Sequence, residues 1–404
     1  MILLHTLGVA VIHIGARRVL PSAARAFGTL LYLGVERGRA VPREELEALL
    51  YPRYGARAAS HGLRQLLYKL RHLGAPVEGR DDIVTVAEHD VSDDVSAVLD
   101  APTIDEQALA SIAAGILPQY SPDFSPALAD WVDLQRARIA QDLRTTLVAR
   151  IAATRGDGKW RALEPLARAC LALDPLNEEA TLALAESLAL NGQKAGAVKL
   201  LDEYLAEIGA YGRDLRVPAH LLRTRISEHV PDPQYRRLGP GPFVGRDAEM
   251  AELWRTLQRA RRGQPGVVVV HGEAGIGKTR LAAEFTQAAA VDGATCVLVG
   301  SSPHDVRRPM GVFMDLVPKL LDSPGGLGVA PESVALLGRL TRPDADTDPV
   351  HKHAEPEALF RMIVDAIADL LQAVSSEAAL VIVLEDAHWA DPSSLDTVQV
   401  LARQ

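Results

Sequence analysis

The spacing of apolar residues along the first hundred positions predicts short strands followed by three helices and a ribbon. Residues 2–20 alternate loosely between apolar and polar and include Gly8 and Gly15, as short strands and turns do. Pro and Gly residues bound three helical patterns, which lie at 21–34, 41–52 and 58–74. The stretch "APVEGRDDIVTVAEHDV", 75–91, then predicts a two-stranded ribbon around its polar turn.

The third predicted helix has one apolar face and one basic face. Leucines at 63, 66, 67, 70 and 73 follow the spacing of a single buried stripe. The opposite arc holds no acid; it carries Arg64, Gln65, Tyr68, Lys69, Arg71 and His72. The element order predicts a winged helix-turn-helix whose third helix enters a DNA major groove and whose ribbon touches the backbone. The alternative is a solvated amphipathic helix.

The middle of the chain is predicted to be all helical, over 101–230. The segment 160–205 pairs helices through small residues and is broken by "DP" at 174–175, a pattern typical of tetratricopeptide-like repeats. Two interpretations stay open for these repeats, a structural spacer and a groove that binds a partner. The Pro- and Gly-rich stretch 231–242 predicts a linker to a further domain.

Residues 271–285, "HGEAGIGKTRLAAEF", contain the spacing G-x-x-x-x-G-K-[ST] between a valine run and a helical pattern. We expect 267–270 to be a buried strand and the backbone amides of the loop to cradle phosphates, with Lys278 at the β and γ phosphates of ATP and the Thr279 hydroxyl on Mg²⁺. The predicted nucleotide-binding residues of this loop are Gly272, Glu273, Ala274, Gly275, Ile276, Gly277, Lys278, Thr279 and Arg280. The alternative is a Gly-rich turn with an exposed lysine.

A second signal of a nucleotide site, a pair of acidic residues, follows about a hundred residues after the glycine loop. The run "ALVIVLEDAHWADPSS", 379–394, predicts a strand that ends in two carboxylates, Glu385 and Asp386, and lies beside the strand that leads into the glycine loop. One carboxylate would hold Mg²⁺ with Thr279, and the other would orient an attacking water. The sequence leaves open which of the two does which.

Length, composition and charge indicate how many domains the chain has and where its positive charge is concentrated. A length of 404 residues indicates two to four domains, and 48% hydrophobic with 24% charged residues is typical of folded soluble proteins. The net charge is −9, yet residues 11–80 hold twelve Arg or Lys against five Glu, a local balance of +7 that fits a DNA partner. With no apolar run of membrane-spanning length and no basic leader, we expect a cytoplasmic protein without a membrane partner.

These stretches resemble a known combination of domains. Residues 1–100 resemble the winged helix of SARP-type antibiotic-regulatory transcriptional activators, through "GRAVPREELEALLYP" and "LRQLLYKLRHLG". Residues 101–230 resemble the bacterial transcriptional activator domain (BTAD) of those proteins, through "ADWVDLQRARI" and "CLALDPLNEEA". Residues 243–404 resemble the first part of a STAND-type AAA ATPase, through "FVGRDAEM", "GEAGIGKTRL" and "LEDAHWADPSS".

The resemblance implies roles for further residues. Val244, Gly245 and Arg246 would lie against the adenine of ATP. That family usually has Asp at the first acidic position of the second motif, where this chain has Glu385. STAND ATPases continue with further strands, a sensor residue and a lid, whereas this sequence stops at Gln404. We therefore expect ATP binding with slow or no turnover, so that ATP hydrolase activity is left open.

The sequence as a whole predicts a multidomain protein: a winged helix, all-α repeats and an α/β P-loop domain with an incomplete parallel sheet. Its predicted function is transcriptional regulation, with ATP and Mg²⁺ switching how a DNA-binding half is presented. The predicted partners are double-stranded DNA and ATP or ADP; contacts with RNA polymerase or a signalling protein, and self-association, stay open. The rivals are an ATPase with a protein-docking half and a repeat scaffold with a vestigial nucleotide site.

Overall fold

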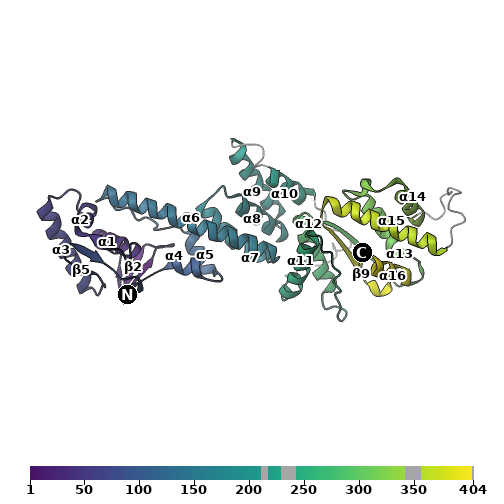
Figure 1. The fold of residues 1–404 in the computed structure, drawn as a ribbon, viewed down its shortest axis with the longest axis horizontal. Helices are drawn as coiled ribbons and strands as arrows, with labels where there is room; N and C mark the ends of the chain where they lie inside the picture. Colours follow the sequence, from purple (N-terminus) through teal and green to yellow (C-terminus); the bar gives the residue numbers. More distant parts are fainter. Residues whose placement is uncertain (211–216, 229–242, 342–355, 403–404) are drawn as a thin grey trace. The chain divides into compact units, whose positions relative to one another are not determined.

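The computed structural model describes residues 1–210, 217–228, 243–341 and 356–402. It is a multidomain, mostly helical structure with small sheets (Figure 1). The predicted linker, 231–242, lies outside the described residues. Contacts between Cα atoms divide the chain into two compact units, Met1–Ala153 with Ala162–Leu184, and Thr154–Arg161 with Ala185–Gln404.

The first unit opens with a four-stranded sheet in the order β3-β2-β1-β7. Its strands are β1 (Ile2–His5), β2 (Val11–Ile14), β3 (Arg17–Val19) and β7 (Val91–Asp93). The first three pair antiparallel, while β7 runs parallel to β1. Alternate residues of β1 and β2 are buried, so the short strands predicted over 2–20 are confirmed.

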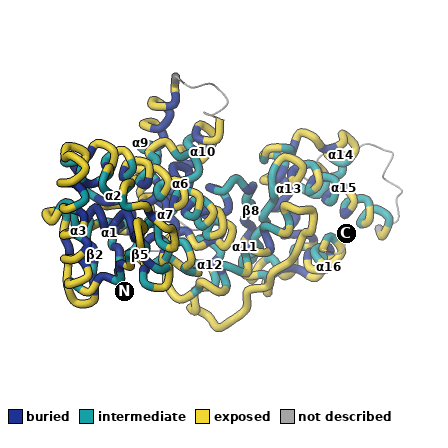
Figure 2. The backbone as a smooth tube through the Cα atoms, turned by 60° about the vertical axis from the view of Figure 1, so that its left-hand side comes forward, coloured by how far each residue is buried: buried dark blue, intermediate teal, exposed yellow. Residues whose placement is uncertain are grey.

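Three helices and a second small sheet complete the core of this region. The helices are α1 (Ala24–Val35), α2 (Arg43–Leu50) and α3 (Ala56–His72). The small sheet has the order β4-β6-β5, formed by β4 (Val41–Pro42), β5 (Glu78–Arg80) and β6 (Ile83–Thr85). The predicted ribbon is present, and β4 is an added strand that the sequence analysis missed. Figure 2 shows buried positions in dark blue along α1 and β2.

Further helices follow in the first unit and across its boundary. They are α4 (Asp94–Asp100), α5 (Glu106–Ala113), α6 (Pro126–Gly156), α7 (Trp160–Leu173) and α8 (Glu178–Leu190). Short apolar side chains line their contacts: Ala167, Ala180 and Ala183 are fully buried. The helical character predicted for this region is confirmed.

The second unit combines a helical pair with an α/β part. Its helices are α9 (Lys194–Glu207), α10 (Val217–Glu228), α11 (Asp247–Arg261), α12 (Lys278–Val291), α13 (Gly311–Leu321), α14 (Pro331–Thr341), α15 (Pro356–Glu377) and α16 (Pro392–Leu401). Its two strands, β8 (Thr295–Gly300) and β9 (Leu380–Glu385), pair in parallel over six residues. None of the helices in the described ranges is both long and apolar enough to cross a membrane.

The valine run before the glycine loop departs from the prediction. Residues 267–270 form no strand in the described structure and are exposed, Val269 at 77%. The strand β9 pairs with β8 instead, so the predicted buried strand beside β9 is wrong for this structure. A strand that is apolar throughout suits a sheet whose two faces are both covered. An apolar pattern does not encode which strand pairs with it.

Candidate functional site

The glycine loop has the backbone that its sequence requires. Gly272, Gly275 and Gly277 have φ values of +153°, +81° and +99°, which side chains with a Cβ rarely adopt. Gly277 is the N-cap residue of α12, so the loop leads directly into the positive end of a 14-residue helix. Glu273, Ala274 and the rest of 271–277 are exposed to solvent. The loop therefore presents a solvent-exposed backbone at a helix N-terminus, the arrangement that binds phosphate.

Lys278 lies against the loop itself. Its Nζ donates hydrogen bonds to the carbonyl oxygens of Gly272 and Glu273, each at 2.9 Å. The ammonium group is thus held at the loop, and its residue is the first of α12. A lysine so placed needs only a side-chain rotation to meet an anion in the loop.

The structure brings Thr279 and Glu385 together. The Thr279 hydroxyl donates a hydrogen bond to Oε2 of Glu385 at 3.0 Å. Glu385 is the last residue of β9, where its backbone lies opposite Gly300 of β8. A hydroxyl and a carboxylate that meet at the carboxyl edge of a sheet are ligands of the kind that Mg²⁺ prefers. The donor set therefore fits a magnesium ion beside the glycine loop.

Asp386 is placed differently from Glu385. Its backbone is in the left-handed region, with φ of +51°, and its side chain is exposed. This turn ends β9 and starts the short 3₁₀ helix η8 (Ala387–Trp389). The two adjacent carboxylates consequently point to different surroundings, which gives a physical basis for different roles.

The segment 244–246 also lies at the glycine loop. Gly245 has φ of +73°, and Arg246 forms the N-cap position of α11. The Arg246 guanidinium donates from Nη2 to the Ile276 carbonyl at 3.0 Å and pairs through Nη1 with Glu249 at 2.6 Å. Val244 is 69% exposed. Of the three residues predicted to contact adenine, Arg246 is thus shown in contact with the loop.

Arg280 is the last of the predicted loop residues. It lies in the first turn of α12 and pairs with Glu284 one turn further along, at 2.6 Å. Its guanidinium is thus turned along the helix surface.

Sequence reasoning missed Asp391. This carboxylate is 2% exposed and accepts hydrogen bonds from the backbone amides of Met310, Gly311 and Ser394 at 3.0, 3.1 and 2.9 Å. Burial alone would raise its pKa, but these bonds and those from the Ser393 and Ser394 hydroxyls outweigh burial and lower the pKa of Asp391 to about 2. The sequence signal was the cap pattern "DPSS", with Pro at the first helical position.

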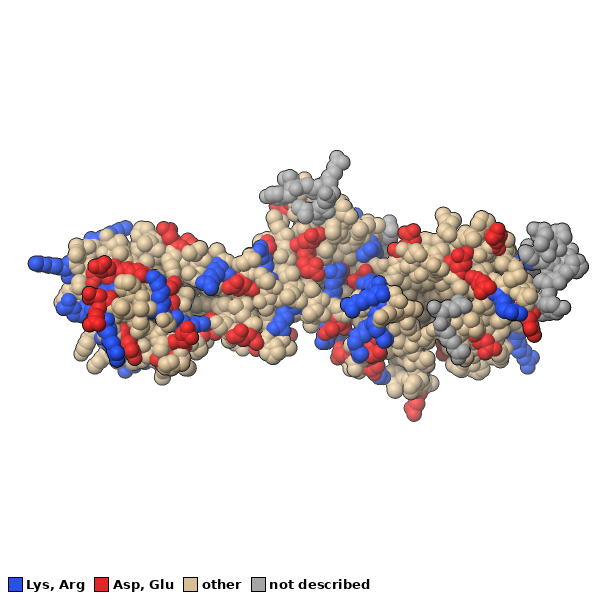
Figure 3. Space-filling view, viewed as in Figure 1, with Lys and Arg blue, Asp and Glu red and all other residues tan. Residues whose placement is uncertain are grey.

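The first unit holds the candidate nucleic-acid interface on α3. Leu63, Leu67 and Leu70 of this helix are buried. The six predicted DNA-contacting residues all lie on the exposed side: Arg64, Gln65, Tyr68, Lys69, Arg71 and His72. Figure 3 shows Lys and Arg side chains around α2 and α3, with acidic side chains beside them.

Two aromatic and polar pairs order this exposed face. The Tyr68 and His72 rings stack at 5.7 Å with an interplanar angle of 18°, and the amide of Gln65 lies 2.9 Å from Nε2 of His61. Arg71 turns toward the ribbon, where its Nε donates to the Val77 carbonyl at 2.9 Å. Arg71 therefore links α3 to the residue that immediately precedes β5.

Arg57 and His61 share the exposed face of α3 and were not predicted. Both side chains are exposed, and they lie seven and three residues before Arg64, which places them on the same helical stripe. Arg57 was missed because α3 begins at Ala56, two residues before the predicted start. The absence of a cap residue such as Ser or Asp at Gly55 explains that error.

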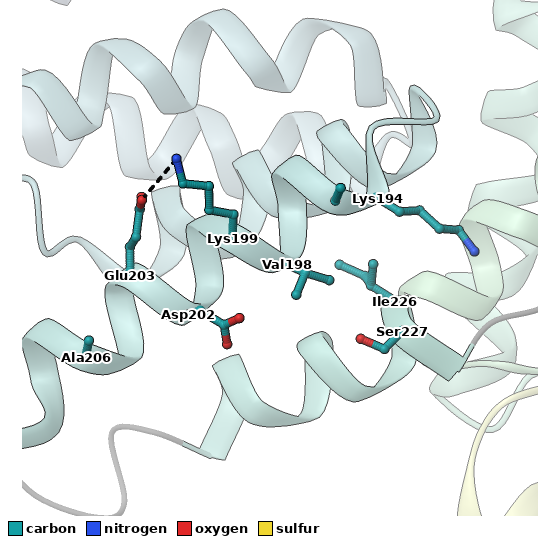
Figure 4. A pocket seen from close by; sticks show the side chains of 9 residues that line it. Lys194, Val198, Lys199, Asp202, Glu203, Ala206, Ile226 and Ser227 are labelled. Carbon is teal, nitrogen blue, oxygen red and sulfur yellow. Dashed lines mark ion pairs between the residues drawn. The ribbon is translucent and has the colours of Figure 1, made fainter.

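A hollow of about 730 Å³ lies between α9 and α10 (Figure 4). Val198, Ala206 and Ile226 supply apolar surface, and Lys199 pairs with Glu203 at 3.6 Å on its rim.

Three comparisons show what this chain is similar to. The chain is 26% identical over 185 residues to an uncharacterized protein of Rhizobium meliloti (strain 1021), a match that covers 42% of this chain and 18% of that protein. The chain thus spans less than two thirds of that relative's length. Among solved structures, Mycobacterium tuberculosis EmbR in complex with a low affinity phosphopeptide is 14% identical, with a TM-score of 0.41 over 66% of this chain and 74% of that one. Residues 242–404, which carry Lys278, Thr279 and Glu385, match the family described as the AAA ATPase domain.

Proposed function

We propose that this chain is an ATP-binding transcriptional regulator with three parts. Residues 1–100 form a winged helix that binds DNA, residues 101–230 form a tetratricopeptide-like BTAD, and residues 243–404 form a STAND-type nucleotide switch. The observation that carries the proposal is the hydrogen bond of 3.0 Å between Thr279 and Glu385, beside a lysine held in a glycine loop. The alternative, a Gly-rich turn that binds no ligand, gives no reason for the Glu385 carboxylate to lie within hydrogen-bond distance of Thr279.

In the nucleotide site, each residue has a distinct task. The backbone N–H groups of 275–279 donate hydrogen bonds to phosphate oxygens. Lys278 exchanges its hydrogen bonds to the Gly272 and Glu273 carbonyls for ion pairs with the β and γ phosphates. Thr279 and Glu385 hold Mg²⁺, which supplies positive charge to the phosphate oxygens when bound. Their direct contact supports Glu385 as the metal-side carboxylate and leaves exposed Asp386 to orient a water.

The DNA-binding half uses α3. The six predicted contact residues comprise three cations, an amide and a stacked Tyr–His pair, without an acid among them. Lysine and arginine at such positions grip phosphates, whereas bidentate Arg or Gln contacts discriminate bases. The ribbon β5–β6 would act as the wing that touches the DNA backbone; Arg71 of α3 donates to Val77, immediately before β5. Binding of ATP would bias the equilibrium between two presentations of this half.

One experiment with two titrations tests the proposal. Isothermal calorimetry with ATP and MgCl₂ measures nucleotide binding, and selection of bound fragments from a random DNA pool measures sequence preference with and without ATP. The proposal expects saturable ATP binding and a DNA preference that changes with ATP. ATP binding without DNA selection would favour an ATPase with a protein-docking half. A protein that binds no ATP would contradict the nucleotide switch, whether or not it selects DNA. That result would point to a scaffold with a vestigial nucleotide site.

A further inference from the structure

The carbonyl group of Ile276 is held by a charged side chain from outside the loop. Ile276 lies between Gly275 and Gly277, whose φ values are +81° and +99°. Nη2 of Arg246 donates to the Ile276 carbonyl oxygen at 3.0 Å. A hydrogen bond from a charged donor is stronger than one between neutral groups. The orientation of this peptide is therefore fixed by Arg246.

That orientation decides where the loop amides point. A loop binds phosphate only when successive N–H groups face inward and the carbonyls face away. Glycine on both sides of Ile276 removes the side-chain hindrance that would otherwise keep the peptide from flipping. Lys278 contacts the carbonyls of Gly272 and Glu273 instead, at the opening of the loop. Arg246 is therefore the side chain that fixes the later half of the loop.

Arg246 is itself held in place by its own helix. Its Nη1 pairs with Glu249, three residues further along α11, at 2.6 Å. The hydrogen bond from Arg246 lowers the pKa of the Glu249 carboxyl, which favours the carboxylate that accepts this bond. The helix α11 is anchored by Trp254, which is fully buried and packs edge to face on Phe285 of α12 at 5.6 Å. Arg246 thus projects from a helix that is fastened to the phosphate-binding helix.

We propose that Arg246 is a positioning residue that holds the Ile276 carbonyl outward and so keeps the phosphate-binding amides arranged before a ligand arrives. This inference rests on the proposed nucleotide binding. It differs from the adenine contact that the family resemblance implies for Arg246. A brace on the loop matters for every ligand that carries a phosphate chain, whereas an adenine contact matters only for ligands that carry the base.

The ligand test separates these roles. The variants are Arg246→Ala, Arg246→Lys and Glu249→Gln. The matched control is Arg255→Ala, because Arg255 also pairs with a glutamate three residues away on α11, Glu252, at 2.6 Å. Calorimetry measures MgATP binding, and inorganic tripolyphosphate with Mg²⁺ competes for the same site. Arg246→Ala should weaken both ligands by about tenfold or more, the effect of losing one charged hydrogen bond. Arg246→Lys should recover part of the loss, and Arg255→Ala should change neither ligand.

A second readout needs no ligand at all. Amide hydrogen exchange over 272–279 should be faster in Arg246→Ala than in the wild type, because the Ile276 peptide is released. The same amides should be unchanged in Arg255→Ala. A loss of ATP affinity with unchanged tripolyphosphate affinity and unchanged exchange would overturn the brace and favour the adenine contact. Wild-type protein that binds no ATP would instead remove the proposed function, a result distinct from failure of the brace.

Discussion

The hydroxyl of Thr279 donates a hydrogen bond of 3.0 Å to the carboxylate of Glu385, across 106 positions of sequence. The threonine lies in the first turn of α12 and the glutamate ends β9, so each is placed by a different element. Their meeting next to Lys278 gives the α/β part of the chain a hydroxyl, a carboxylate and an ammonium group within one small region. That combination is what a nucleotide triphosphate with Mg²⁺ requires.

Lys278→Ala should remove most nucleotide binding and leave the fold intact. The lysine ammonium group donates to two carbonyls of the exposed loop, so its loss creates no buried cavity. The loss of charged hydrogen bonds to phosphate should lower ATP affinity by about a hundredfold. Calorimetry with ATP and Mg²⁺ measures it, and Lys199→Ala, on the exposed rim of the α9–α10 hollow, is the control. Equal affinities of Lys278→Ala and wild type would contradict the assignment of this loop.

The two carboxylates after β9 should respond differently to substitution. Glu385→Gln should reduce the Mg²⁺-dependent part of ATP affinity by about tenfold, because Glu385 is the carboxylate in contact with Thr279. Asp386→Asn, at an exposed position, should leave that affinity unchanged. The measurement is an ATP titration with Mg²⁺ and with EDTA for each variant. The reverse pattern, a loss with Asp386→Asn alone, would exchange the two roles.

Local patterns predicted the parts of these sites that are formed by neighbouring residues. The glycine loop and the start of α12 follow from four residues at fixed spacing, two glycines, a lysine and a threonine. The exposed face of α3 follows from its leucine stripe, because a helix that buries one face must expose the other. Both could be predicted because 3.6 residues per turn and positive φ at glycine are local properties.

Long-range placement could not be predicted in the same way. The valines at 267–270 have the composition of a buried strand yet are exposed, since strand order depends on partners elsewhere in the chain. The partner of β9 is β8, eighty-five positions earlier by the register of Cys296 with Val381. Asp391 accepts a hydrogen bond from the amide of Met310, which lies 81 positions away. The sequence signals its role as the N-cap of α16 but not this long-range contact.

The exposed stripe of α3 should carry DNA affinity. Changing Arg64 and Lys69 together to Ala should weaken binding to all sequences if both contact phosphate, and should flatten the dependence of log K on log salt by about one unit per lost contact. If one of them contacts a guanine, discrimination at a single base pair should fall by about 1–3 kcal/mol. Fluorescence anisotropy over a salt series measures both effects.

A matched control for the α3 variant is Arg17→Ala with Arg18→Ala on β3. These two arginines are exposed, and their loss removes the same charge as the α3 variant. They lie in the four-stranded sheet of the first unit and not on α3. Their loss should leave the salt dependence nearly unchanged. If the α3 variant and the β3 variant behave alike, α3 is only a solvated helix face.

Asp391 should stabilise the α/β part in a pH-dependent manner. Hydrogen bonds lower its folded-state pKa to about 2, below the ordinary value for aspartate. A depressed pKa contributes stability above the unfolded-state pKa near 4, and this contribution, about 2 kcal/mol, is lost as the pH falls from about 4 to 2. Asp391→Asn should lower stability at pH 7, since an amide cannot accept from the Met310, Gly311 and Ser394 amides on both of its atoms. Urea unfolding at pH 7 and pH 3 should show a gap between wild type and variant that shrinks at pH 3. Asp396→Asn, exposed on the same helix, should show little change at either pH, and equal stabilities of the two variants at pH 7 would refute the role of Asp391.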